Sequence, residues 1–384
     1  MSKDVVKQFD KLLNNSSHVL ILLPESPKHD LFCCALALTH FCEVKSITTT
    51  IAYSDPFEET ASLNFLPRAK NSSIVHSISG SRDLILSFNT KYNKILNVQT
   101  EPGEDTLNIR ITPEHGMVDS RDFSFLPGKF PYDIIIAIGA IEKESMGKIY
   151  DDMPDIFYEI PIINIDNKSA NEQYGQVNIV NAVASSVSEV VGDVLEKLPS
   201  TKIPKTCAQC LLAGIISETN SFQNHNTTPH ALTLASHLIE LGADQQIIIH
   251  NLYRNQTFSL LQLWGRTMKN LTTLPCHKQI VISTITHQDR IQTKAEKHQL
   301  HAILKKMKQN YPSGKIFLLV YENDDHTFCA LIDTKNANLA LEETLDGITV
   351  LEEYNYELPL AAHSTEEIHT DMCDLLMPYI SLLN

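Results

Sequence analysis

No uncharged apolar run in this 384-residue chain approaches the roughly 18–20 residues that a membrane-spanning helix requires. The first ten residues scatter charges through the segment where a secretory signal would carry an apolar stretch. Glycine and proline are few, at 13 and 17 residues, while 43% of the chain is hydrophobic, a balance that argues against disorder. We therefore expect a globular, cytoplasmic protein with no membrane partner.

Basic residues are also in deficit, with 31 against 46 acidic ones and a formal charge of −15. A field of this sign repels polyphosphate, so we expect no extended nucleic-acid-binding face, although a local basic pocket stays open. Eight cysteines show no disulfide-scaffold spacing. Cys207-x-x-Cys210 lacks a second such pair or a nearby histidine pair, so packed, reduced thiols are expected rather than a zinc site.

What the chain does contain is an alternation of apolar runs with helix-like segments. Residues 18–23, 31–41 and 46–53 predict a strand, a helix and a strand, which is a βαβ unit. Residues 94–112 alternate around Glu-Pro-Gly-Glu-Asp and predict an antiparallel hairpin inserted into the parallel sheet. Further strands buried in the sheet are predicted at residues 83–88, 133–138 and 162–165.

The length and the change of texture after Leu274-Pro275 predict two domains. Residues 1–244 are expected to form a parallel-sheet α/β domain, and residues 245–275 a helical linker. Residues 276–384 alternate strand-like and helix-like segments and predict a smaller, mixed α/β domain.

Two stretches carry a pattern far more specific than periodicity. Residues 163–189 read INIDNKSANEQYGQVNIVNAVASSVSE, and residues 211–222 read LLAGIISETNSF, followed by LGAD at 241–244. They resemble the third and fourth motifs of the DHH phosphoesterases, in particular the oligoribonuclease and phosphoadenosine-phosphatase branch. PKHD at 27–30 lies where the first motif belongs, and LWGR at 263–266 is similar to the family's linker.

The resemblance implies a two-domain α/β fold and two-metal phosphoester hydrolysis. In that chemistry two Mn²⁺ ions, held by aspartates and histidines, activate a water and neutralise charge on the phosphoryl oxygens. Family members also often form homodimers.

The ligand positions of this chain depart from the family pattern. Only three carboxylates remain at those positions, namely Asp30, Asp166 and Glu218. The other positions hold side chains that do not suit a dication: Pro24, Lys28, Gly139, Asn167 and Lys168. We expect no cofactor and no metal, because a pair of dications without anionic ligands lacks charge compensation.

The two lysines have alternative interpretations. In the first, Lys28 and Lys168 occupy the space of the metals and form buried ion pairs with the remaining carboxylates. In the second, the lysines together with Asn167 bind a phosphate. Asp30 is open to two interpretations as well, as a remnant metal ligand or as the N-cap of the helix that follows it. Asp166 could likewise serve only to cap the turn after its strand.

The expected second domain also departs from the family. Asp333 follows a predicted strand where an arginine would grip a phosphate, and Gly347 stands alone instead of a glycine-rich loop. Acidic side chains at positions 342, 343, 346, 352 and 353 would repel an anionic substrate.

Two functional hypotheses follow from these departures. The first is a pseudoenzyme retained for binding or assembly, as a homodimer, a homo-oligomer or a partner of another protein. The alternative is a phosphodiesterase or phosphatase acting on short oligonucleotides or small nucleotides, with Mn²⁺ held by Asp30, Asp166 and Glu218. Counting the lost ligands favours the first.

Overall fold

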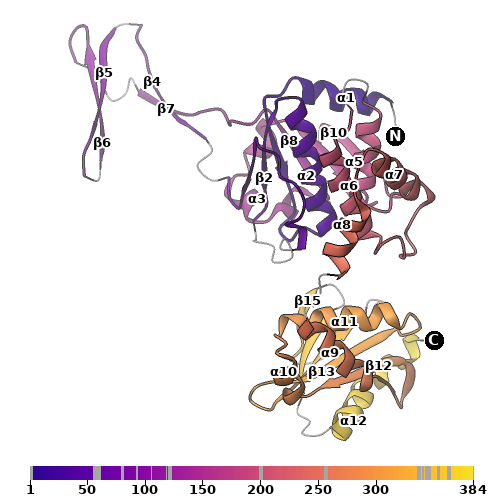
Figure 1. Ribbon diagram of the computed structural model, residues 1–384. Helices are drawn as coiled ribbons and strands as arrows, with labels where there is room; N and C mark the ends of the chain where they lie inside the picture. The colour runs from indigo at the N-terminus through magenta and orange to yellow at the C-terminus, as the bar shows by residue number, and fades with distance from the viewer. Residues whose placement is uncertain are drawn as a thin grey trace. The chain divides into compact units, whose positions relative to one another are not determined.

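The structure is a computed structural model. It describes residues 3–54, 62–78, 82–91, 94–104, 106–117, 119, 123–198, 202–254, 258–334, 339, 341, 347–352, 355–360 and 365–383. The chain divides into two compact units, Met1–Arg254 and Asn255–Asn384 (Figure 1). The division falls within residues 245–275, the segment expected to link the two domains.

The first unit is built on a six-stranded, all-parallel sheet in the order β10-β9-β8-β1-β2-β3. Its strands are β1 (His18–Leu22), β2 (Thr48–Ala52), β3 (Ser72–Val75), β8 (Ile134–Ile138), β9 (Ile162–Asp166) and β10 (Val177–Val180). Strand order runs outward in both directions from the neighbouring pair β1 and β8. The carboxyl ends of that pair therefore form a topological switch point, where α/β sheets place their ligand sites.

Both faces of this sheet are buried, as the apolar runs predict. Val19 and Ile21 face the larger core with helices α1 (Lys3–Asn14), α2 (His29–Val44), α5 (Val187–Glu196), α6 (Lys205–Glu218), α7 (Pro229–Glu240) and α8 (Gln245–Ile249). Leu20 and Leu22 face the smaller core with η3 (Lys143–Met146), α3 (Lys148–Asp152) and α4 (Ile156–Glu159). The π-helical turn His250–Arg254 ends the unit.

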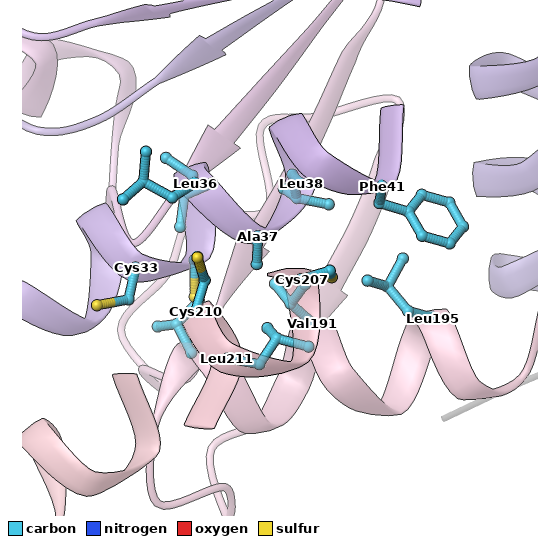
Figure 2. Close-up of a cluster of buried hydrophobic side chains, with 14 of the residues drawn as sticks. Cys33, Leu36, Ala37, Leu38, Phe41, Val191, Leu195, Cys207, Cys210 and Leu211 are labelled. Carbon is cyan, nitrogen blue, oxygen red and sulfur yellow. The ribbon is translucent and has the colours of Figure 1, made fainter. Parts of the chain in front are cut away.

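Helices α2 and α6 are packed along each other through small side chains. Figure 2 shows Cys33 and Ala37 of α2 beside Cys207, Cys210 and Leu211 of α6. All five cysteines of the two helices (Cys33, Cys34, Cys42, Cys207 and Cys210) are free and buried. The prediction of packed, reduced thiols at the Cys-x-x-Cys segment is therefore confirmed.

An insertion between β3 and β8 forms two ribbons of its own (Figure 1). β5 (Ile95–Pro102) pairs with β6 (Leu107–Pro113), as predicted, and β4 (Leu84–Phe88) pairs with β7 (Phe123–Pro127). The prediction of a buried sheet strand at 83–88 is wrong, because β4 hydrogen-bonds only to β7 and Leu84 is 73% exposed. A short apolar run does not reveal which strand it pairs with.

The second unit contains a mixed sheet in the order β11-β12-β13-β14-β16-β15, in which only β12 and β13 are parallel. Its strands are β11 (Thr272–Leu274), β12 (His277–Ile285), β13 (Ile316–Glu322), β14 (Phe328–Asp333), β15 (Thr349–Glu352) and β16 (Asn355–Leu360). This arrangement confirms the predicted mixed α/β domain.

Helices cover both faces of the second sheet. α9 (Phe258–Lys269) and α11 (His298–Asn310) pack on one face through Leu263, Leu300 and Ile303, and α10 (His287–Thr293) contacts α9. α12 (Thr365–Leu376) packs on the other face through Ile368 and Met372 and continues into η6 (Met377–Leu383). Among the described residues of both units, no helix is long and apolar enough to cross a membrane.

We expect the eight thiols to react with a thiol reagent in two groups. Burial raises the pKa of Cys42 and that of Cys210 to about 12, so the reactive thiolate is scarce as well as inaccessible. Only the half-buried Cys276, Cys329 and Cys373 should react in the native protein, and Cys276 should be slow because its pKa is raised to about 11 by burial and by the neighbouring Cys373. The other five should react upon unfolding in guanidinium, and rapid labelling of all eight in the native state would contradict this packing.

Candidate functional site

The retained motif residues gather at the switch point of the first sheet. Pro24 follows β1, Gly139 follows β8, and Asp166 is the last residue of β9. Asp30 lies in the first turn of α2 and Glu218 is the last residue of α6. The carboxyl ends of the parallel strands therefore bring together, at one edge, the residues that the motif resemblance singles out.

The Asp30 carboxylate is buried against the N-terminus of α5. Its Oδ2 accepts a hydrogen bond from the Val187 N–H at 2.7 Å, and its Oδ1 accepts from the Ser188 N–H at 3.1 Å and from the Ser188 hydroxyl. The N-cap of α2 is Lys28, so the interpretation of Asp30 as the cap of its own helix is wrong. Asp30 instead supplies negative charge at the N-terminus of α5, where the helix dipole favours it.

The surroundings of Asp30 are closely packed. The Cys34 thiol lies 3.1 Å from the Ser188 hydroxyl, and Gly214 of α6 leaves no room for a side chain. A Cβ added at Gly214 would lie 1.9 Å from Ser188 Oγ and 2.7 Å from Asp30 Oδ1. Burial raises the pKa of Asp30 to about 6, and the negative charge of Glu218 adds to the rise. Asp30 and Glu218 are therefore close enough to interact.

Asp166 belongs to a network of amide side chains. Its carboxylate accepts hydrogen bonds from the Asn167 N–H at 2.7 Å and from Asn171 Nδ2 at 2.9 Å. Asn164 Nδ2 in turn donates to Asn171 Oδ1 at 2.6 Å and to Asn178 Oδ1 at 3.1 Å. Asp166 thus caps the turn after its strand, and a buried carboxylate is stabilised by neutral donors instead of a cation.

The two lysines do not occupy this interior. Lys28 and Lys168 are both exposed, and among the described residues no ion pair joins either of them to Asp30, Asp166 or Glu218. The prediction of buried ion pairs is therefore wrong. Asp30 and Asp166 need no cation, because backbone N–H groups, a hydroxyl and an amide donate hydrogen bonds to them. Asn167 donates its Nδ2 to the Ala184 carbonyl at 3.2 Å.

A leucine side chain fills the space beside Gly139, one of the positions that the motif resemblance singles out. Gly139 has a φ of +68°, and its N–H donates to the Ile165 carbonyl at 2.8 Å. A Cβ built on Gly139 would lie 2.4 Å from Leu31 Cδ2. The Leu31 side chain, only 8% exposed, therefore fills the space that a side chain at position 139 would enter, and it would have to move to admit one.

These residues do not fit a pair of Mn²⁺ ions. Among the described residues, no group of three or more histidine, cysteine, aspartate or glutamate side chains is placed so that it could hold a metal ion. Pro24 supplies no side-chain donor, and Leu31 blocks the space next to Gly139. Both oxygens of Asp30 already accept protein hydrogen bonds, so no step of a two-metal mechanism can be assigned to this chain's residues.

Asp333 of the second unit, which stands where the resemblance would place an arginine, is paired within the fold. Both oxygens of Asp333, at the end of β14, accept from the Lys308 ammonium of α11, at 2.8 and 3.0 Å. No atom lies within 4 Å of where a Cβ of Gly347 would be. Of the acidic residues at positions 342, 343, 346, 352 and 353, only residue 352 is among the described residues, at the end of β15.

Sequence reasoning missed three residues that shape the site, namely Leu31, Ser188 and Gly214. Gly214 carried a usable signal, because a glycine inside an otherwise apolar helix often marks a close approach of another element. Leu31 and Ser188 carried none, since nothing in a linear pattern indicates which distant group a leucine or a serine will contact.

A separate cavity lies at the opposite edge of the same sheet. Its volume is about 460 Å³, and it lies beside the segments that precede β8 and β9. Its lining residues are Lys129, Phe130, Tyr132, Asp133, Glu159, Ile160 and Pro161. None of the motif residues lines this cavity.

Comparison with known proteins finds partial sequence matches and one structural likeness over the whole chain. No family model matches the chain. A stretch of 81 residues is 30% identical to the bifunctional oligoribonuclease and PAP phosphatase NrnA of Thermus thermophilus, covering 21% of this chain and 25% of that protein. A stretch of 113 residues is 29% identical to the protein of the same name from Bacillus subtilis, covering 29% of this chain and 36% of that protein. The matches thus span about a quarter to a third of those relatives.

The structural likeness extends over the whole chain. The crystal structure of an exopolyphosphatase-related protein from Bacteroides fragilis covers 100% of this chain and 98% of its own, with a TM-score of 0.67 and 15% sequence identity. At that identity the likeness establishes the fold alone. The chain has the two-domain α/β fold of the DHH-type phosphoesterases, which confirms the resemblance seen in its motifs.

The buried Asp30 should make the unfolding free energy depend on pH in a defined direction. Because its folded-state pKa is raised from 3.8 to about 6, the folded state binds this proton more tightly than the unfolded state. Stability from this group is fully present below about pH 4 and is lost as the pH rises through about 6, an effect of about 3 kcal/mol.

In Asp30→Asn this pH dependence should vanish, as measured by urea unfolding followed by circular dichroism between pH 4 and 7.5. Glu218→Gln is the control, because removing its charge should lower the pKa of Asp30 and move the transition to lower pH. Identical pH profiles for wild type and Asp30→Asn would contradict the assignment.

The contact between Leu31 and Gly139 should appear as coupling between two substitutions. Gly139→Ala should destabilise the first unit by about 2–4 kcal/mol, because it adds a methyl group in a filled space at a positive φ. Combined with Leu31→Ala, its cost should fall, since the leucine that opposes the methyl group is gone. Strictly additive free energies of unfolding would show that the two side chains do not compete for one space.

Proposed function

We propose that this chain is a catalytically degenerate homologue of the DHH phosphoesterases, a pseudoenzyme retained for binding or protein assembly. The observation that carries the proposal is the filled space beside Gly139, where the Leu31 side chain lies in the direction that a metal-binding side chain at this position would take. Two-metal hydrolysis requires anionic ligands that bridge and surround both ions. A leucine methyl group in that space provides neither charge nor lone pairs.

The remaining carboxylates support the same proposal. Asp30 connects α2 to the N-terminus of α5, and Asp166 fixes the turn after β9 through Asn167 and Asn171. Both act as hydrogen-bond acceptors within the fold. A metal would have to displace these protein donors, each worth about 1.5–3 kcal/mol when the acceptor is charged.

The second unit supports the proposal independently. Asp333 stands where the resemblance would place a phosphate-binding arginine, and its carboxylate is paired with Lys308 within the fold. The net charge of −15 adds general repulsion toward polyanionic substrates. The proposal gives the chain a role in assembly, with another copy or another protein as its partner.

A metal titration and an activity assay test the proposal together. Calorimetric titration with Mn²⁺ should give no binding at micromolar concentrations, because the ligand set is incomplete. Incubation with a short oligoribonucleotide, adenosine bisphosphate or cyclic dinucleotides in Mn²⁺ should give no product, while the NrnA protein of Bacillus subtilis serves as the positive control.

Product formation that is abolished in Glu218→Ala would overturn the proposal in favour of a metal-dependent phosphodiesterase or phosphatase. Micromolar Mn²⁺ binding that is lost in Asp30→Asn and Asp166→Asn would do the same. Lys28→Gln is a matched control, since an exposed lysine outside the carboxylate cluster should change neither result.

A further inference from the structure

The β5–β6 hairpin exposes an apolar face. Residues opposite each other across the pair share a face, and Val98 is opposite Ile111 while Thr100 is opposite Ile109. The exposed members of this face are Val98 at 57%, Leu107 at 65% and Ile109 at 47%, and Leu96, exposed at 65%, lies next to them at the register shift between Ile95 and Asn97. We call these four side chains the hairpin apolar face.

The other face of the same hairpin is polar. Gln99 is opposite Arg110, and Glu101 is opposite Asn108, with the Arg110 guanidinium 3.1 Å from the Glu101 carboxylate. The alternation is therefore that of a strand pair with one face in water and one face covered. Among the described residues, neither strand hydrogen-bonds to any other strand, so no element of the sheet covers the apolar face.

A hairpin of this kind is marginally stable by itself. Two isolated strands rarely hold together in water, and an apolar face needs further strands or another surface to cover it. The adjoining β4–β7 ribbon has the same property, with Leu84 and Phe125 exposed at 73% and 71%. The insertion therefore concentrates large exposed apolar side chains, which is typical of an interaction surface.

The charge of the insertion argues for a second copy of this chain as the occupant. Residues 82–130 contain six basic and seven acidic side chains, so they are nearly neutral within a chain of charge −15. Two copies of so acidic a chain repel each other over most of their surface. The insertion is where they can approach with little electrostatic cost.

The charges along the hairpin also favour one orientation. Lys91 and Lys94 lie at the open end of the hairpin with Glu114, whereas Glu101 and Glu104 lie near its turn. Two hairpins packed in opposite directions about a twofold axis bring the lysine end of each copy near the glutamate end of the other. Packing in the same direction would bring like charges together.

We propose that this chain forms a twofold dimer in which the hairpin apolar faces of two copies pack against each other, with the hairpins antiparallel. A face of two seven- to eight-residue strands covers only about 270 Å² per copy. That is well below the ~800 Å² of a standard interface, so the dimer is weak, with a dissociation constant in the micromolar range. The inference extends the proposed role in assembly.

Sedimentation equilibrium of the full chain at 1–100 µM tests the dimer. The wild type should approach twice the 43.1 kDa chain mass at the upper concentrations. Val98→Asp combined with Ile109→Asp should raise the dissociation constant at least 100-fold, because two charges would be buried in the interface. The matched control, Gln99→Asp with Asn108→Asp, adds the same charge to the polar face and should change it by less than about threefold.

Three results would overturn the proposal: a monomeric wild type at every concentration, equal weakening by both double variants, or no weakening by either. Circular dichroism checks that each variant is folded. If the aspartates unfold the hairpin, Val98→Thr with Ile109→Thr keeps its β-branched side chains and should still weaken the dimer about tenfold. Sedimentation measures molecular mass, so the dimer and the proposed loss of activity can be disproved separately. An active enzyme can dimerise, and an inactive one can be monomeric.

A charge exchange tests the orientation at low ionic strength. Lys94→Glu and Glu104→Lys should each weaken the dimer several-fold by placing like charges across the twofold axis. The two substitutions combined should restore wild-type affinity, since each copy again presents opposite charges to the other. Failure of the combination to restore affinity would overturn the antiparallel arrangement.

Discussion

The buried carboxylate of Asp30 is the contact on which the architecture of the first unit depends. It joins the start of α2 to the N-terminus of α5 through Val187 and Ser188, and it does so against Gly214 of α6. Helix α2 is thereby fixed to α5 and α6, which follow it by more than 140 residues, at the carboxyl edge of one sheet. Such an arrangement tolerates little change, because a buried charge without its donors is costly and a side chain at position 214 has no space.

The same edge is where the motif resemblance would place metal ligands, and the residues there are engaged within the fold. Leu31 fills the space beside Gly139, and Asp30 and Asp166 accept hydrogen bonds from backbone N–H groups, a hydroxyl and an amide. Neutral donors suffice because a helix N-terminus and a set of aligned dipoles stabilise a carboxylate without a counter-ion. Lys28 and Lys168 both lie at the surface.

The insertion has a different physical basis from the rest of the unit. The six-stranded sheet is buried on both faces by helices, whereas the β5–β6 hairpin has one face with nothing on it among the described residues. The exposed apolar side chains of this face are the basis of the proposed association between two copies. The hairpin and the sheet edge that holds Asp30 and Asp166 are thus separate features. The hairpin face is exposed, whereas the two carboxylates are buried.

The sequence by itself determined the local elements. Continuous apolar runs specified β1, β8 and β9, alternation specified the β5–β6 hairpin, and the motif resemblance indicated the two-domain fold. Only the tertiary structure decided the partners of Asp30, the place of Leu31, the exposure of Lys28 and Lys168, and the pairing of β4 with β7. The reason is that periodicity records how a segment meets its immediate environment, whereas hydrogen bonds between residues 30 and 187, or a contact between residues 31 and 139, exist only once the sheet has brought distant segments together.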